Sequence, residues 1–132
     1  MRSLIALAIA SGMAYVANRY LVSRLGTIAL ITLVPPLEEL LKTGATILLQ
    51  ASIWWVHLGF GLLEAAVNLG RNPRSLPEVG FLAAIGSIVG HAAFGVITLW
   101  GQSRSGHWLG GLALGSGLHL LWNMWVVRLS EC

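Results

Sequence analysis

The chain has 132 residues, of which 56% are hydrophobic and only 10% are charged, and its mean hydropathy is +0.77. A soluble domain carries about 25% charged residues on its surface, so this composition excludes an ordinary water-soluble fold and favours lipid as the solvent. The formal net charge of +3 does not indicate nucleic-acid binding, because the eight basic residues are scattered and form no stripe. The single cysteine, Cys132, allows no intramolecular disulfide.

Long apolar runs predict an all-α integral membrane protein, a compact bundle of about five transmembrane helices in a single polytopic domain, 1–132. The first span covers residues 3–22. We interpret it as a spanning helix and not as a signal peptide, because its hydrophobicity continues to Val16. The second span, 26–50, contains Pro35 and Pro36, which are expected to kink it. The third, 54–69, is short and is expected to be tilted or only partly inserted.

The polar loop 70–78 precedes the fourth span, 79–100, and the fifth span covers 106–127. If all five cross, five arginines lie on one side and Arg2 and Arg104 lie on the other. The positive-inside rule then places the C-terminus and the loop 70–78 in the cytoplasm. That orientation depends on whether the third span crosses.

Aromatic and histidine side chains near the predicted span ends are interpreted as interfacial anchors. They are Trp54, Trp55, Trp100, Trp108, His57 and His107. Trp122 lies deeper and is expected to pack beside the buried ionisable residues. Glycines four residues apart favour close helix packing within the chain over homodimerisation. They are Gly86 and Gly90, Gly106 and Gly110, and Gly111 and Gly115.

Several ionisable residues lie inside the predicted spans, where each costs at least ~2.5 kcal/mol at the bilayer centre. They are Glu38, Glu39, Glu64, His91 and His119. Counted from the arginine-rich side, Glu38 and His91 lie ~18 Å deep and His119 ~12 Å deep, so one layer can hold them all. Helical i, i+4 spacing adds Lys42 beside Glu38, Asn68 beside Glu64, and Asn123 beside His119.

Carboxylates and histidines shielded from bulk water suit general acid–base activation of a water molecule. The same residue types also bind divalent metals such as zinc, with Glu64, His91 and His119 as the candidate ligands. The sequence leaves both chemistries open. It contains no HExxH pattern and no recognisable serine or cysteine nucleophile. A purely structural ion pair of Glu38 with Lys42 remains an alternative, as does non-catalytic hydrogen bonding by Glu64 and Asn68.

Four motifs resemble those of the PrsW-type intramembrane proteases, in the same order. Glu38, Glu39 and Lys42 match the EExxK motif, and Phe60 with Glu64, followed by Asn68, matches FxxxE. His91 matches the third motif, and His119 with Asn123 matches the fourth. Together the motifs span residues 35–123. The resemblance extends distantly to the CAAX-prenyl-protease and bacteriocin-processing membrane proteins, which carry EExxxR and FxxxH instead.

The resemblance implies an intramembrane endopeptidase of a prokaryotic cell membrane, whose substrate is a membrane-anchored protein similar to an anti-sigma factor. It implies that Glu38 or Glu39 is the base and that Glu64 and His91 hold the water. It also implies that His119 and Asn123 support the tetrahedral intermediate. The chain is short for this family and lacks extra helices that select a substrate.

Two other functions stay open. Buried carboxylates and histidines also form proton or cation pathways in transporters, although no inverted repeat is evident in the sequence. A non-catalytic bundle that binds another membrane protein is the third possibility, and it predicts that Glu38→Gln and His119→Ala are tolerated.

Overall fold

The computed structural model describes residues 1–71 and 77–130, and every regular element in these ranges is a helix. The six helices are α1 (Arg2–Leu25), α2 (Thr27–Thr32), α3 (Val34–Leu49), α4 (Ile53–Arg71), α5 (Pro77–Ser105) and α6 (Trp108–Ser130). The all-α prediction is therefore confirmed. Most of the predicted loop 70–78, namely residues 72–76, lies outside the described residues.

The predicted second span, 26–50, is wrong as a single helix, because the chain forms α2 and α3 with a break at Leu33. Pro35 and Pro36 occupy the first positions of α3, where a missing backbone N–H leaves no hydrogen bond unmade. The prolines are expected to kink the span. In the structure the helix is interrupted just before them, and the interruption is a complete break between α2 and α3. α3 ends at Leu49, and the capping residue Gln50 has a left-handed φ of 51°.

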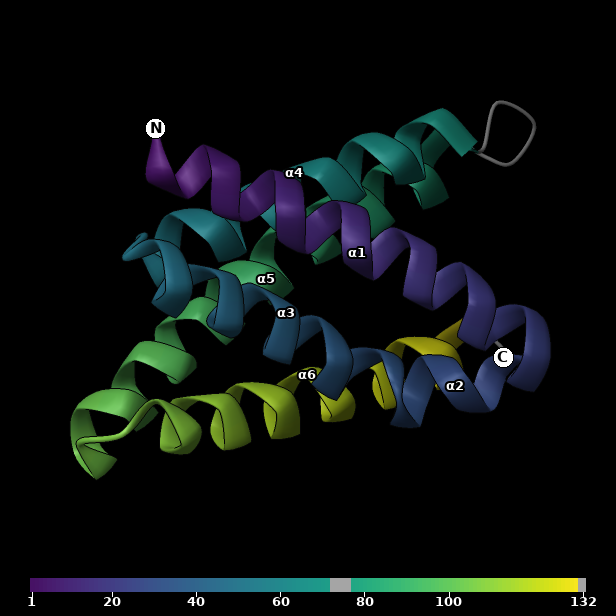
Figure 1. Cartoon of the computed structure of the whole chain (residues 1–132). Coiled ribbons are helices and arrows are strands. Elements are labelled where there is room, and N and C mark those ends of the chain that lie inside the picture. Colours follow the sequence, from purple (N-terminus) through teal and green to yellow (C-terminus); the bar gives the residue numbers. More distant parts are fainter. Residues whose placement is uncertain (72–76, 131–132) are drawn as a thin grey trace.

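Helix α3 is the central element. It lies between α1 and α6 (Figure 1) and also contacts α4, while α5 packs on both α4 and α6. The residues that α3 buries include Glu38, Glu39, Lys42, Thr43 and Thr46. A helix that buries its charged residues needs partners for them from the neighbouring helices, because an unpaired buried charge is very costly.

Glycines bring α5 and α6 into close contact, as their spacing predicts. A Cβ atom built on Gly101 would lie 2.8 Å from the carbonyl oxygen of Gly110, and one on Gly90 would lie 3.2 Å from the indole of Trp122. Gly86 also faces Trp122, at 3.8 Å. The small residues therefore serve packing within the chain, and they let the backbones of the two helices approach each other.

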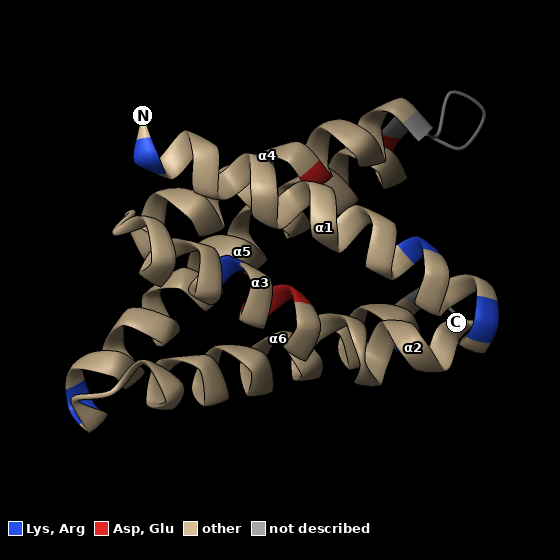
Figure 2. Cartoon of the chain, in the orientation of Figure 1, with Lys and Arg blue, Asp and Glu red and all other residues tan. Residues whose placement is uncertain are grey.

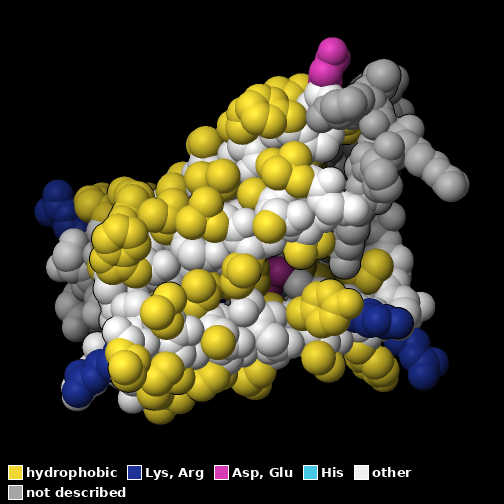
Figure 3. All heavy atoms as spheres, turned by 90° about the horizontal axis from the view of Figure 1, so that it is seen from above, with side chains coloured by type: hydrophobic (Ala, Val, Ile, Leu, Met, Phe, Trp, Pro, Cys, Tyr) yellow, Lys and Arg dark blue, Asp and Glu magenta, His cyan; other side chains and the backbone are white. Residues whose placement is uncertain are grey.

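The distribution of side chains is inverted relative to a soluble protein. Many of the most buried apolar residues are small, such as Ala6, Ala10 and Ala29 at 0% exposure, whereas Leu4 is 70% exposed and Leu48 84%. Figure 3 shows hydrophobic side chains over most of one face, with an acidic side chain at the floor of a hollow between them. Figure 2 shows most basic residues at the ends of helices and acidic residues within α3 and α4.

Two of the described helices are long and apolar enough to cross a membrane, judged by length and composition. They are α1, over Arg2–Leu25, and the Glu78–Ser105 part of α5. A buried core helix or a signal sequence can meet the same criteria, so these helices are weak support for membrane association.

Candidate active site

Four helices bring seven ionisable side chains together in the middle of the molecule, and we call them the polar cluster. α3 supplies Glu38, Glu39 and Lys42, α4 supplies His57 and Glu64, and α5 and α6 supply His91 and His119. Six of the seven are buried, at 0–7% exposure. The side chain of Glu64 is 47% exposed. The five residues that the sequence placed in one layer therefore do converge.

Glu39 is the centre of the polar cluster. Its Oε1 atom accepts from Lys42 Nζ at 2.5 Å and from His119 Nδ1 at 3.1 Å, and its Oε2 atom lies 2.8 Å from His57 Nε2. Three partners from three helices thus compensate a carboxyl group with no exposed surface. This arrangement holds α3, α4 and α6 together and leaves Glu39 little freedom to act as a base.

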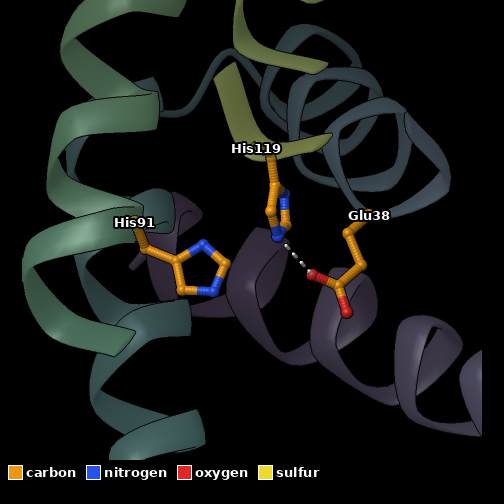
Figure 4. Close-up of side chains that lie close together, drawn as sticks. All are labelled: Glu38, His91 and His119. Atoms are coloured by element: carbon orange, nitrogen blue, oxygen red, sulfur yellow. Dashed lines mark ion pairs between the residues drawn. The ribbon is translucent and has the colours of Figure 1, made fainter. Parts of the chain in front are cut away.

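Glu38 has different surroundings. Its Oε1 accepts a hydrogen bond from the amide of Asn18 on α1, and its Oε2 lies 3.8 Å from His119 Nε2. Figure 4 shows the carboxylate directed toward the imidazole of His119, with His91 on the other side of His119 in this view. Glu38 is thus the carboxylate of α3 that has an oxygen available to a small molecule between itself and His119.

Hydrogen-bond partners assign the tautomers of two histidines. His91 Nδ1 lies 3.1 Å from the Lys42 ammonium, which can only donate, and Nε2 lies 2.8 Å from Glu64 Oε2. His91 therefore carries its proton on Nε2. His119 Nδ1 faces Glu39, so its proton is on Nδ1, and Nε2 keeps a lone pair toward Glu38.

Lys42 is buried between aromatic rings and acceptors. Its Nζ lies 4.6 Å from the centroid of the Phe60 ring, in addition to its contacts with Glu39 and His91. An ammonium over a ring face is attracted by the ring quadrupole. The predicted i, i+4 ion pair of Lys42 with Glu38 is wrong, because the i, i+3 partner Glu39 takes that place.

A cavity of about 790 Å³ opens beside the polar cluster, between α1, α3, α4 and α6, and we call it the site cavity. Its lining includes Asn18, Glu38, Glu64, His119 and Asn123. Glu39 and His91 lie behind this lining. Trp122 packs near the cluster, 6.4 Å between ring centroids from Phe94, which itself stacks on His119 at 4.3 Å. The prediction for Trp122 is confirmed.

The two asparagines of the motifs have partners other than those that helical spacing suggests. Asn68 donates to Ser87 Oγ on α5 at 3.0 Å, so it joins α4 to α5 and does not pair with Glu64. Asn123 lines the site cavity and donates to the Leu30 carbonyl at 2.9 Å. Its contact anchors α2 against α6.

Sequence reasoning missed two members of the site. His57 is wrongly interpreted as an interfacial anchor, since it has no exposed surface and lies against Glu39. Asn18 received no role, although it binds Glu38. Both lie inside predicted apolar spans, and a polar side chain within such a span is the signal that could have identified them. His107, in contrast, is exposed at the turn between α5 and α6, as expected of an anchor.

The donor set fits a divalent metal poorly. Glu38, His91 and His119 offer three ligand atoms within 4.8 Å of one another, so Glu38 replaces Glu64 in the predicted set. Both nitrogens of His91 are already engaged, and the Lys42 ammonium lies 3.1 Å from Nδ1. A catalytic zinc takes three protein ligands. Of these three residues, only Glu38 and His119 keep free lone pairs for a metal. The Lys42 ammonium beside His91 carries the same sign of charge as a metal cation.

Comparison with protein-family models, with curated protein sequences and with solved structures gave no match to this chain.

Proposed function

We propose that the chain is a multi-pass integral membrane protein with about five crossings. Two helices of sufficient length and hydropathy, the exposed large apolar side chains and the buried charges support this proposal. α4 has 19 residues, which correspond to about 28 Å and are close to the thickness of the hydrocarbon core. The α2–α3 pair then forms one interrupted crossing, with its break at Leu33.

We further propose an intramembrane endopeptidase of the PrsW type, which hydrolyses a peptide bond of a membrane-anchored protein such as an anti-sigma factor. The observation that carries this proposal is the division of labour on α3. Glu38 faces the site cavity and His119 Nε2, whereas Glu39 is fully engaged by buried partners. A carboxylate with an adjacent hydrogen-bond acceptor is the arrangement that holds and deprotonates a water molecule.

In the proposed reaction, one hydrogen of the water points to Glu38 Oε2 and the other to His119 Nε2, which are 3.8 Å apart. Glu38 takes the first proton while the water oxygen attacks the scissile carbonyl carbon. The C–N bond then breaks, and the proton on Glu38 passes to the leaving amine. His119 thus orients the water, and the oxyanion role falls to Asn123, whose second amide N–H is free to donate.

The remaining members of the cluster have positioning roles. Glu39 holds His119 Nδ1–H, and so it directs the His119 Nε2 lone pair to the water. Lys42 and Glu64 fix His91 from both sides. The mechanism requires no metal, in keeping with the engaged nitrogens of His91.

Purified protein in liposomes, incubated with a library of single-pass membrane proteins, tests this function. Cleavage should be lost with Glu38→Gln, by about 10²–10⁴-fold for a general base, and should persist in the presence of a chelator. Glu78→Gln is the matched control, because Glu78 is exposed in the first turn of α5. Cleavage that disappears with chelator and returns with added metal would overturn the metal-free mechanism.

A proton or cation pathway is the second candidate function, and one observation favours it. A continuous chain of contacts runs from the half-exposed Glu64 through His91 and Lys42 to Glu39 and His57. Such chains carry protons in transporters. If no substrate is cleaved and the liposomes show an ion flux that Glu64→Gln and His91→Ala abolish, the transporter replaces the protease.

A further inference from the structure

His57 on α4 is a buried titratable residue that the proposed reaction does not use. Its Nδ1 lies 2.9 Å from the Ile53 carbonyl oxygen, and its Nε2 lies 2.8 Å from Glu39 Oε2. Neither His57 nor Glu39 has any exposed surface. Both ring nitrogens therefore face oxygen atoms, and no water can be expected to separate them at these distances.

The two contacts together determine how many protons the pair must hold. A carbonyl oxygen only accepts, so Nδ1 carries a proton. Nε2 and Glu39 Oε2 also need a proton between them, since two lone pairs at 2.8 Å repel each other. That proton belongs either to the ring, giving imidazolium and carboxylate, or to Glu39, giving imidazole and carboxylic acid. In both forms the pair holds two protons and has a net charge of zero.

We propose that His57 and Glu39 form a neutral two-proton pair and that His57 is a positioning residue, which sets the charge and orientation of the proposed active site. It confines Glu39 Oε2, so that Oε1 remains available to Lys42 and to His119 Nδ1–H. The inference rests on the proposed function for its consequence in catalysis. The state of the pair itself is independent of that function.

The neutral pair changes the charge that Glu38 experiences. The polar and charged groups around Glu38 come from five helices. They are Tyr15, Asn18 and Arg19 of α1, Glu39 and Lys42 of α3, Glu64 of α4, His91 of α5, and His119 and Asn123 of α6. When Glu39 is neutralised by His57, the charge of Lys42 is left to favour an ionised Glu38. Replacing His57 by a neutral residue makes this site one unit more negative.

The first experiment observes the pair directly in the wild-type protein. NMR of ¹⁵N- and ¹³C-histidine-labelled protein in micelles should show one ring with a fixed proton on Nδ1 and a strongly deshielded proton shared by Nε2. These signals should vanish in His57→Gln and persist in His107→Gln, the exposed control. A His57 ring with its only proton on Nε2 and a bare Nδ1 would overturn the inference. This result does not depend on cleavage activity.

The second experiment measures cleavage against pH. In His57→Gln the acidic limb of the profile should move to higher pH by about one unit, the effect of a single charge at an effective dielectric of about 20, because Glu38 keeps its proton longer. The double variant Glu39→Gln/His57→Gln restores the net charge of the site. The acidic limb of its profile should therefore return toward the wild-type position, although its overall cleavage rate should be lower. His107→Gln should match the wild type.

An acidic limb that does not move in His57→Gln, or that stays displaced in the double variant, would overturn the role of His57 while wild-type cleavage stands. Absence of cleavage by the wild type would instead overturn the proposed function, and the NMR result alone would then decide the state of the pair.

Discussion

Asn18 is the residue that α1 contributes to the site, and its amide donates to Glu38. Asn18→Ala removes this donor and should lower the cleavage rate by about tenfold to a hundredfold, the worth of a hydrogen bond to a charged group. Ser11→Ala is the matched control on α1, because Ser11 lines the same cavity but bonds to the Leu7 carbonyl of its own helix. Steady-state cleavage of one membrane substrate measures both. An Asn18→Ala rate within twofold of wild type would contradict the role.

Glu39 and Lys42 are a buried ion pair at 2.5 Å, with no exposed surface on either side chain. Glu39→Gln leaves a buried ammonium without its carboxylate and should lower the free energy of unfolding by about 3–5 kcal/mol. Glu39→Gln/Lys42→Met removes both charges and should recover a large part of this loss. Unfolding of the wild type, the two single variants and the double variant in micelles gives the coupling energy of the pair. If the losses in free energy of unfolding simply add, Glu39 and Lys42 do not stabilise each other.

At the scale of the elements, α5 and α6 depend on glycine for their separation. Gly101→Ala would place a Cβ atom 2.8 Å from a backbone oxygen of α6, and it should destabilise the protein by about 1–3 kcal/mol. Gly117→Ala is the control on α6, where a Cβ atom meets nothing within 4 Å. That change should be neutral or stabilising by up to about 1 kcal/mol. Equal melting temperatures for the two variants would refute close packing at Gly101.

The break between α2 and α3 also has a consequence for the site. α3 begins at Val34, so Glu38 and Glu39 lie little more than one turn from its N-terminus. The start of α3, where a helix generally leaves backbone N–H groups unpaired, therefore lies about one turn before these carboxyl groups. One continuous helix over 26–50 would have no such end there.

At the scale of the whole molecule, the proposal of five crossings predicts on which side of the membrane each loop lies. Under this proposal, the positive-inside rule places Cys132 in the cytoplasm and the turn between α5 and α6 outside. A membrane-impermeant maleimide added to intact cells should therefore leave the native Cys132 unlabelled. It should label Ser103→Cys in a Cys132→Ser background, since Ser103 is exposed. Labelling of Cys132 alone in intact cells would show that the topology is the reverse of the predicted one. Labelling of both Cys132 and Ser103→Cys would show that α6 does not cross the membrane.

The sequence alone determined the helical class, the approximate positions of α1, α4, α5 and α6, and every member of the polar cluster except His57. The reason is that these features depend on local pattern: apolar length defines the helices, and an ionisable residue inside them needs a partner. Pro35 and Pro36 likewise predicted an interruption. Its position at Leu33 and the existence of a separate helix α2 are known only from the structure.

Only the tertiary structure decided which partner each of these residues takes. Adjacent Glu38 and Glu39 point about 100° apart on a helix, but which of them meets a cavity depends on the helices packed around α3. Lys42 pairs with Glu39 and not with Glu38, because the ammonium group also contacts His91 and the Phe60 ring on the same side of α3 as Glu39. His57 became part of the site because α4 turns it toward Glu39. Partners that lie on different helices are set by packing, which no local pattern encodes.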